Sequence, residues 1–489
     1  MCISCHNFMF PFQWEVKASK NDLFSSRIDL SNITYEMSGC WLRKTDINGF
    51  VNGEDWYNEH NYFYGFTHKV LYDNGDDDSL LRHFERIEPK ENHVVYSIEC
   101  CGRVYDLEVK SINLDIYSTG VGVLSFFLFN NNYTALEDIL NINQFGRRIF
   151  PPYFASIKSR EILAERISIR GLRGAEDCYS DDFSNHAYTD SNRPACFLKK
   201  LINDVATNIE IEPVIDDRMF VQCLYKNDEW ADKMARSDGE TGFLMSEPWY
   251  DFVFVDLNGK NLTCGNDEMR KSLVRKSTYD RWKDRGTLYG VTRFSMVCLT
   301  RSDSDEFVFN YFSTIYARMV ELVLVQRASV LRFSDEVTNI SNSKDNKSYS
   351  ENVSSLYREY IRFINQIHFR EVSAQDQGIE LYKKLYHIMD IGAQSKKLEE
   401  EIEEVYSYVS LQESRDTNHT MTILTVFASL LIPMTVIASI FGMNNIWFIG
   451  DNNGQTTAWY NHGVWQFGIL IGVTAISCLF IWLKINRKR

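Results

Sequence analysis

The strongest constraint on this chain is a pair of long apolar stretches near its C-terminal end. Residues 420–441 and 464–483 contain no Asp, Glu, Lys or Arg. Each stretch is long enough to cross the hydrocarbon core of a bilayer as a helix, because spanning takes about 20 residues. A buried core hairpin is the alternative, but core helices usually show a polar face and are shorter. The sequence therefore predicts two transmembrane helices.

The flanking charges predict how these helices are oriented. Arg415 precedes the first stretch, and the second is followed by Lys484, Arg487, Lys488 and Arg489. The connecting segment, 442–463, contains no Lys or Arg. Since positively charged flanks stay on the cytoplasmic side, we expect both termini and the basic tail 484–489 in the cytoplasm and the loop 442–463 outside. Residues 1–14 lack the pattern of a signal peptide, so the large N-terminal part is expected to stay in the cytosol.

Charge is distributed unevenly along the chain. The formal net charge is −14, from 52 basic and 66 acidic residues. From residue 415 onward the balance is +3, so the preceding 414 residues carry −17. Proteins that bind nucleic acid by neutralising phosphates need a basic surface, so we expect no direct nucleic-acid binding. An acidic body suits a protein that handles cations.

Eleven cysteines are scattered along the chain without a regular framework, so free thiols are expected in a reducing compartment. Cys2, Cys5 and His6 have the spacing of a haem attachment site or of half a zinc site. No second Cys/His pair follows at zinc spacing, and haem attachment of this kind takes place outside the cytosol. The sequence therefore predicts no certain metal site.

Residues 1–305 are predicted to form a cytosolic domain of strands and helices. Runs of β-branched and aromatic residues between polar turns predict strands at 94–98, 104–109, 113–117, 122–129, 252–256 and 293–299. Helical patterns lie between them, at 156–167 and 196–206. This alternation predicts a mixed α/β or α+β domain.

Residues 306–417 are predicted to form a helical stalk. Apolar residues recur at helical spacing through 310–333, and the pattern resumes at 353 after a polar linker. No proline occurs between Pro248 and Pro433, as long helices require, because an interior proline costs about 3 kcal/mol. The last helix is expected to run from about Ile379 into the first membrane helix without a break.

The last stalk helix combines an apolar seam with an acidic surface. Leu398, Ile402, Val405 and Val409 recur at steps of four, three and four and would pack against neighbouring helices. The other faces carry Glu399, Glu400, Glu401, Glu403 and Glu404. These glutamates form either a solvated helix surface or a carboxylate ring that concentrates cations near a pore mouth.

One face of the first membrane helix carries most of its polar groups. Steps of three or four residues align Asn418, Met421, Thr425, Ala428, Ile432, Thr435 and Ser439. Polar side chains are costly against lipid, so this face either packs on another helix or lines a water-filled path. The periodicity leaves both alternatives open.

The end of this helix resembles the pore helix of CorA-type magnesium transporters. The matching residues are those of the stretch 418–425, Pro433-Met434-Thr435 and the triplet Gly442-Met443-Asn444. Members of that family end their first membrane span with the same Gly-Met-Asn triplet and carry a second span close to the C-terminus. The position of the triplet, after a charged stalk helix and at the outer end of the first of two spans, makes the resemblance specific.

The resemblance implies an α+β membrane protein that assembles as a funnel-shaped homopentamer in the inner membrane. Each protomer would contribute a large cytosolic α/β domain, a long helical stalk and two C-terminal transmembrane helices. The implied parts are a cytosolic domain (1–305), a helical stalk (306–417), a pore helix (418–441), an outer loop (442–463), a second membrane helix (464–483) and a basic tail (484–489).

The resemblance also implies the roles of individual residues. Asn444 would form an outer ring of amide oxygens around a hydrated divalent cation, next to Met443, and Gly442 would allow close backbone approach. The path below would be lined by Asn418, Met421, Leu424, Thr425, Ala428, Ile432 and Thr435. Mg²⁺ dehydrates reluctantly, so neutral oxygens that act on its water shell suit it. Met421 and Leu424 would close the path by dewetting.

Three features depart from the family pattern. After the triplet the chain continues with Asn445-Ile446-Trp447-Phe448 instead of an aromatic residue and a Met-Pro-Glu-like loop. Lys383 and Lys384 occupy the place where magnesium-sensing members carry a regulatory acid, and lysines cannot coordinate a divalent cation. The cytosolic part is also longer than transport alone needs.

Two functions therefore stay open. One is a housekeeping transporter of Mg²⁺ or Zn²⁺. The other is a signal-gated channel, similar to the enlarged CorA-like effectors of type III CRISPR antiviral systems, which an adenylated nucleotide messenger of the S-adenosylmethionine–AMP kind would open. The candidate contacts for such a nucleotide are Arg147, Arg148, Arg170 and Arg173. Ordinary salt bridging is the alternative role for these arginines.

The chain shows no enzyme motif. Gly120-Val121-Gly122 lacks the third glycine of a dinucleotide-binding loop. The sequence also contains neither a Gly-Lys-Ser/Thr phosphate loop nor a His-Glu-x-x-His pair. We therefore expect no enzymatic activity.

Overall fold

A computed structural model describes most of the chain, and the chain divides into two compact units, Met1–Glu403 and Glu404–Arg489. The described residues are 2–17, 23–36, 39–45, 59–76, 78–149, 164–173, 179–183, 195–216, 218–236, 242–257, 264–304, 306–341, 346–442 and Gly472. The predictions for Met443, Asn444, the loop after Gly442, the second membrane helix apart from Gly472 and the basic tail lie outside them.

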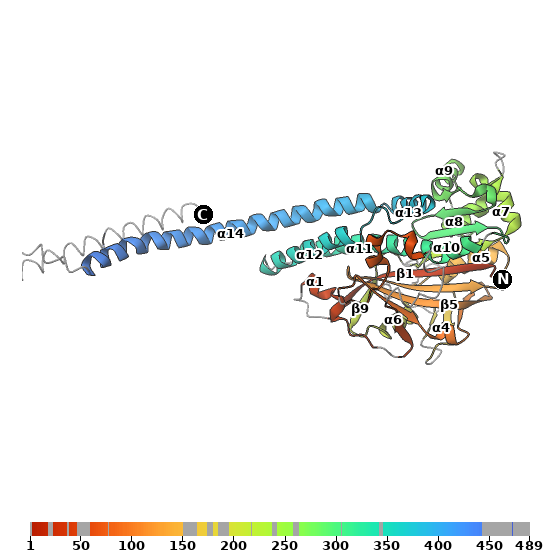
Figure 1. The fold of residues 1–489 in the computed structure, drawn as a ribbon, viewed down its shortest axis with the longest axis horizontal. Coiled ribbons are helices and arrows are strands. Elements are labelled where there is room, and N and C mark those ends of the chain that lie inside the picture. The colour runs from red at the N-terminus through yellow and green to blue at the C-terminus, as the bar shows by residue number, and fades with distance from the viewer. Residues whose placement is uncertain are drawn as a thin grey trace, which may run out of the picture. The chain divides into compact units, whose positions relative to one another are not determined.

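The first unit is built on one large sheet (Figure 1). Its strands are β1 (Ser4–Val16), β2 (Trp41–Arg43), β3 (Leu81–Arg86), β4 (Val95–Cys100), β5 (Arg103–Tyr117), β6 (Val121–Asn130), β7 (Arg166–Arg170), β8 (Ser180–Asp182), β9 (Ile209–Pro213), β10 (Phe220–Lys226), β11 (Thr278–Tyr279), β12 (Leu288–Val291) and β13 (Ser295–Thr300). The main path runs β11-β12-β13-β10-β1-β6-β5-β4-β7-β8, with β2, β3 and β9 attached beside it. Among the described strands only β10 and β13 pair in parallel, so the class is α+β.

The long N-terminal strand β1 lies at the centre of this sheet. One edge of β1 pairs with β6, and the other pairs first with β10, up to Met9, and then with β9, from Phe12. Pro11 falls between these two partners, where a missing N–H group costs no ladder hydrogen bond. Residues 4–12 are all buried, because helices cover both faces of the strand. A strand covered on both faces lacks the alternation of apolar and polar residues by which a strand is recognised in a sequence.

Helices lie between and after the strands in the described part of the chain. They are α1 (Phe24–Arg27), α3 (His68–Leu71), α4 (Glu88–Glu91), α5 (Leu136–Gly146), α6 (Cys196–Asn203), α7 (Asp228–Ala235), α8 (Glu247–Phe254), α9 (Asp267–Ser277), α10 (Glu306–Ser313), α11 (Ile315–Ser341), α12 (Asn346–Gln366), α13 (Asp376–Ile388) and α14 (Ile391–Gly442). Short 3-10 turns are η1 (Leu30–Asn32), η3 (Gly65–Thr67), η6 (Phe243–Met245) and η7 (Lys283–Arg285).

The core of the first unit forms where α11 packs on β1 and β6. Helices α10, α12 and α13 contact α11 from its other sides. Among the described residues, the stretch Glu306–Ser341 is the one that is long and apolar enough to cross a membrane by length and composition, and 61% of its apolar window is buried inside the structure. Since α11 packs between a sheet and three helices, we assign it to the protein core.

The structure confirms several predicted elements and merges two of them. Strands at 94–98, 122–129 and 293–299 correspond to β4, β6 and β13, and the helix at 196–206 corresponds to α6. The predicted strands at 104–109 and 113–117 are one strand, β5, with an irregularity between Val109 and Ser111. The polar residues around this bulge interrupt the sequence pattern, but the strand continues beyond it.

Two other local predictions are wrong. Residues 252–254 end a helix, α8, instead of starting a strand. The Ser246 side chain accepts a hydrogen bond from the Trp249 N–H, and Pro248 lies in the first turn, so strong start signals decide in favour of the helix. Ile167 lies in β7, although the sequence pattern assigned it to a helix whose other residues mostly fall outside the described part.

The predicted unbroken helix from Ile379 is also wrong. Helix α13 ends at Ile388, and Asp390 adopts the left-handed conformation with φ of 57°. Its N–H donates to the His387 carbonyl, and its own carbonyl accepts from the Gln394 N–H. The chain therefore turns at Asp390, and α14 starts as a separate helix at Ile391.

The Cys2, Cys5 and His6 cluster is structural. Cys5 and His6 are neighbours on β1, so their side chains point to opposite faces of the sheet. Both ring nitrogens of His6 lie within hydrogen-bond distance of a side chain, 2.8 Å from Ser4 Oγ and 2.7 Å from Asn143 Oδ1, and burial lowers the pKa of His6 to about 4. Within the described part of the chain, no three His, Cys, Asp or Glu side chains are grouped to hold a metal ion.

Candidate ion-conduction helix

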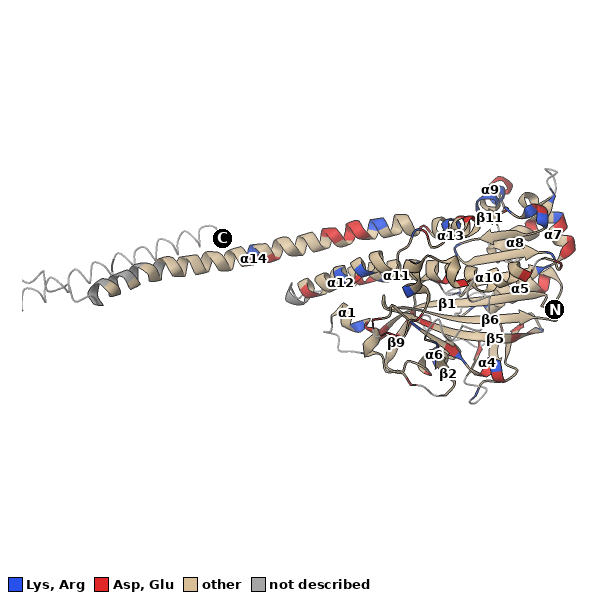
Figure 2. Cartoon of the chain, in the orientation of Figure 1, with Lys and Arg blue, Asp and Glu red and all other residues tan. Residues whose placement is uncertain are grey.

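Helix α14 has two halves of different chemistry. Its 52 residues correspond to about 78 Å at about 1.5 Å per residue. Every charged side chain of the helix lies in its first half, up to Asp416, whereas 417–442 contains no Asp, Glu, Lys or Arg (Figure 2). The helix therefore changes at residue 417 from a surface that water solvates well to one that suits a bilayer.

The first half carries the predicted apolar seam. Leu398, Ile402 and Val409 are buried, and Val405 is half-buried. Near the start of the helix, the Tyr360 hydroxyl of α12 donates to the Ser395 carbonyl of α14 over 3.1 Å. This hydrogen bond ties the beginning of α14 to α12.

The glutamates of the first half lie on its surface. Lys396 and Lys397 approach Glu400 and Glu401 at 3.9 Å and 3.6 Å, one turn further along the helix. Exposed pairs of this kind contribute at most about 1 kcal/mol each. Glu399, Glu403 and Glu404 are also exposed. This arrangement fits a solvated helix surface in a single chain and leaves open a carboxylate ring in an assembly.

All seven predicted path-lining residues lie in the second half of α14, and all are exposed in the single chain. They are Asn418, Met421, Leu424, Thr425, Ala428, Ile432 and Thr435. The large apolar members are the most telling, since Met421 is 59%, Leu424 63% and Ile432 61% exposed. An apolar surface of this size needs lipid or protein to cover it.

Several hydroxyl groups in this half donate hydrogen bonds to carbonyls of their own helix. Thr425 Oγ1 donates to the Met421 carbonyl over 2.7 Å, and Thr435 Oγ1 lies 3.0 Å from the Leu431 carbonyl and 2.8 Å from that of Ile432. A hydroxyl that donates to its own backbone carries little cost in a bilayer. Its oxygen keeps lone pairs that can accept hydrogen bonds from the water shell of a cation.

The family triplet begins where α14 ends. Gly442 is the last described residue of α14, so the predicted end of the first membrane helix stays a prediction. Met443 and Asn444 follow outside the described residues. Their role in ion selection therefore stays a prediction.

The four arginines predicted for a nucleotide have structural contacts. Arg147 is buried at the end of α5, where Nη2 donates to Gln144 Oε1 and to the Val255 carbonyl. Arg148 is also buried, and its backbone forms a bridge with that of Arg218.

The other two arginines of this set lie at and after the end of β7. Arg170 pairs with Asp106 at 2.8 Å, and Arg173 pairs with Glu91 at 3.0 Å. These contacts favour ordinary salt bridging, and nucleotide binding by the four arginines stays a prediction.

The lysines at the presumed regulatory position belong to α13. Lys383 lies 3.5 Å from Glu371, and Lys384 Nζ donates to the Lys276 carbonyl over 2.7 Å. Burial lowers the pKa of Lys384. Because Asp390 separates α13 from α14, these residues do not belong to the same helix as the predicted path-lining residues.

Sequence reasoning missed an aromatic pocket around η7. Trp282 and Arg285 line it, together with residues of β12, α10 and α13. A signal was present in the sequence, because Arg281, Lys283 and Arg285 surround Trp282 within five residues. Cations next to an exposed aromatic side chain are typical of sites for anionic ring compounds.

The comparison with known families falls on the helical part of the chain. Residues 291–488 match the family model described as CorA-like Mg²⁺ transporter protein. This range begins at the end of β12 and includes all of α10 to α14. No curated protein matches the chain. The predicted resemblance to CorA-type transporters is confirmed by this match over residues 291–488.

Proposed function

We propose that this protein forms a cation channel or transporter in the inner membrane and that α14 lines its path. The observation that carries the proposal is a coincidence of three features: the family match, the uncharged half of α14 and the Gly-Met-Asn triplet that starts at its last helical residue. As the family resemblance implies, five protomers would surround one path, each with two membrane helices and both termini in the cytoplasm. The proposal includes no enzymatic activity.

The proposed path has neutral ligands from end to end. Asn444 presents amide oxygens at the outer end, Thr435 and Thr425 present hydroxyl oxygens below it, and Met421 with Leu424 forms an apolar constriction. Neutral oxygens act on the water shell of Mg²⁺ without stripping it. The apolar level closes the path when it excludes water.

An exchange of one amide tests this path. Asn444→Ala removes the outer ring of oxygens, so we expect reconstituted vesicles to lose preference for Mg²⁺ over monovalent cations while the assembly keeps its size. Asn445→Ala, at the neighbouring asparagine, is the matched control and should keep the wild-type preference. Unchanged selectivity in Asn444→Ala would refute this assignment of the outer site.

We further propose that a cytosolic ligand gates the path. Residues 1–290 precede the family match and supply nearly all of the sheet. A domain of this size can bury a ligand site. The specific hypothesis is a type III CRISPR antiviral effector that an adenylated nucleotide messenger opens.

The alternative is a housekeeping Mg²⁺ or Zn²⁺ transporter that its own cation regulates. Flux into vesicles distinguishes the two when Mg²⁺ and an S-adenosylmethionine–AMP conjugate are titrated separately on the cytoplasmic side. The ligand-gated proposal expects the conjugate to open the path and Mg²⁺ alone to leave it unchanged. Closure by Mg²⁺ without any response to the conjugate would favour the housekeeping transporter.

A further inference from the structure

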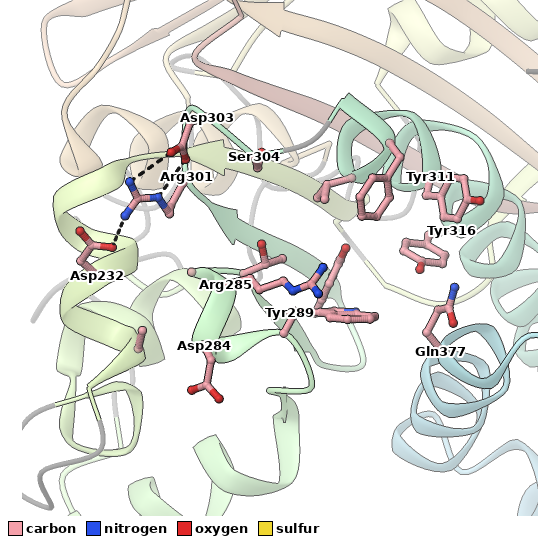
Figure 3. Close-up of a pocket in the computed structure, with 16 residues that line it drawn as sticks. Asp232, Asp284, Arg285, Tyr289, Arg301, Asp303, Ser304, Tyr311, Tyr316 and Gln377 are labelled. Carbon is pink, nitrogen blue, oxygen red and sulfur yellow. Dashed lines mark hydrogen bonds and ion pairs between the residues drawn. The ribbon is translucent and has the colours of Figure 1, made fainter.

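A cavity of about 400 Å³ lies in the first unit between η7, β12, α10 and the start of α13 (Figure 3). One end of this cavity is aromatic and the other is charged. Figure 3 shows Tyr289, Tyr311 and Tyr316 on one side and Asp232, Arg301 and Asp303 on the other, with Arg285 drawn between them. We call this cavity the η7 pocket.

Aromatic side chains from three elements build the first end. The rings of Tyr289 and Tyr316 meet edge to face at 5.9 Å, and those of Phe307 and Tyr311 do so at 5.8 Å. Tyr289 and Tyr316 are buried and hold the wall in place, whereas Phe307 is 49% exposed. Trp282, from the loop before β12, is half-buried. A flat ring entering this end finds ring edges and faces on several sides, as stacking requires.

The charged end is largely neutralised within the protein. Arg301 lies 2.6 Å from Asp232 and 2.9 Å from Asp303, so its charge is shared by two carboxylates. Gly286 lies against it with φ of 72°, and a Cβ atom there would come within 2.7 Å of Arg301 Cδ. Arg301 therefore forms a fixed wall and is not available to bind an anion.

Arg285 is the available cation of the pocket. Its guanidinium carbon lies 5.5 Å from the centre of the Trp282 ring, and within the described residues it forms no ion pair with a carboxylate. Arg281 provides a natural comparison. It lies 5.6 Å from the same ring, but it pairs with Glu380 at 2.6 Å and does not line the pocket. Two arginines thus contact one tryptophan, and only Arg285 faces the cavity without a partner charge.

We propose that the η7 pocket binds a ligand of the nucleoside monophosphate class. The base would stack among the aromatic side chains, and the phosphate would pair with Arg285. Three aspartates against two arginines in the lining disfavour a polyphosphate, because each added phosphate brings more negative charge.

The position of the pocket connects it to the conduction helix along the chain. Gln377, in the first turn of α13, lines the cavity, and α13 is followed after Asp390 by α14. A ligand that contacts Gln377 therefore contacts α13, the helix that precedes α14 in the chain. As a gating site, the pocket rests on the proposal of a ligand-gated channel, but binding itself does not.

The test is calorimetric titration of the purified full-length protein with AMP, GMP, CMP and UMP. We expect at least one of them to bind and Arg285→Gln to weaken that binding about tenfold or more, as loss of a charge-assisted contact should. Phe307→Ala should also weaken it, whereas the matched control Arg281→Gln should stay within about twofold of wild type. Failure of all four nucleotides to bind, or equal weakening by the two arginine variants, would overturn the proposal.

Two smaller probes separate the parts of the ligand. Adenosine and inorganic phosphate should each bind more weakly than the best monophosphate, and equal binding by either would contradict the two-ended pocket. Because heat of binding is measured without ion flux, the outcomes are independent of transport. If a nucleotide binds in an Arg285-dependent way but the protein passes no cation, the pocket proposal stands and the channel proposal is refuted. If the protein passes cations but no nucleotide binds, the channel proposal stands and the pocket proposal is refuted.

Discussion

At the scale of residues, the clearest unusual group is a buried glutamate in the core helix. Glu321 of α11 accepts a hydrogen bond from the Tyr117 hydroxyl over 2.7 Å, and Arg318 approaches its other oxygen at 3.6 Å. Burial is the largest effect and the nearby Asp115 carboxylate the second, and together they raise the pKa of Glu321 to about 8. The positive charge of Arg318 lowers this pKa by less. The Glu321 carboxyl is therefore mostly protonated in the folded chain near neutral pH.

This proton predicts how stability changes with pH. An unfolded glutamate has a pKa of about 4.3, so the folded chain holds a proton that the unfolded chain releases between that value and about 8. The contribution of Glu321 to stability should consequently fall as pH rises through this range. Glu321→Gln, which cannot ionise, should remove this part of the slope. Urea midpoints of both proteins at a series of pH values measure it, and parallel curves would contradict the assignment.

The sequence could not reveal this group. Glu321 lies within an apolar helical pattern, and its partner Tyr117 is 204 residues away on β5. The same limit applies to the η7 pocket, whose Trp282 and Tyr316 come from elements that only the fold brings together. Residue types are visible in a sequence, but their burial and their distant neighbours are not.

At the scale of elements, the turn between α13 and α14 is the feature that sequence periodicity missed. Apolar spacing and the absence of proline predicted one continuous helix, and both signals are satisfied by two helices as well. Asp390 allows the chain to form two helices instead of one, because an aspartate tolerates the left-handed conformation better than most residues. By contrast, β4, β6 and β13 were predictable because their apolar runs are bounded by turn residues.

The turn can be tested by exchanging its residue. Asp390→Gly should keep or raise stability, by up to about 1 kcal/mol, because glycine adopts positive φ without strain. Asp390→Val should lower stability, since a β-branched residue is strained there. As a control, Glu399→Gly in the interior of α14 should cost about 1 kcal/mol, the opposite sign to Asp390→Gly. Denaturant midpoints measure the stability of all three variants. A loss of stability in Asp390→Gly would contradict the left-handed conformation of residue 390.

At the scale of the whole molecule, the two parts of the chain were predictable to different degrees. The uncharged half of α14 and the Gly-Met-Asn triplet are local in sequence, so both the hydropathy and the family resemblance could be predicted without a structure. The sheet domain was predictable only as a class. Its central strand β1 pairs with residues up to 221 positions away in the sequence, so no local pattern contains its position.

The central claim, that one face of α14 lines a cation path, is tested most directly by flux through a variant with a polar constriction. Leu424→Ser places a hydroxyl at the apolar level, so vesicles with this variant should take up Mg²⁺ faster than wild type without any ligand, because the constriction stays wet. Ile423→Ser, about 160° around the helix from Met421, should behave as wild type. No gain in Leu424→Ser, or an equal gain in Ile423→Ser, would contradict the account.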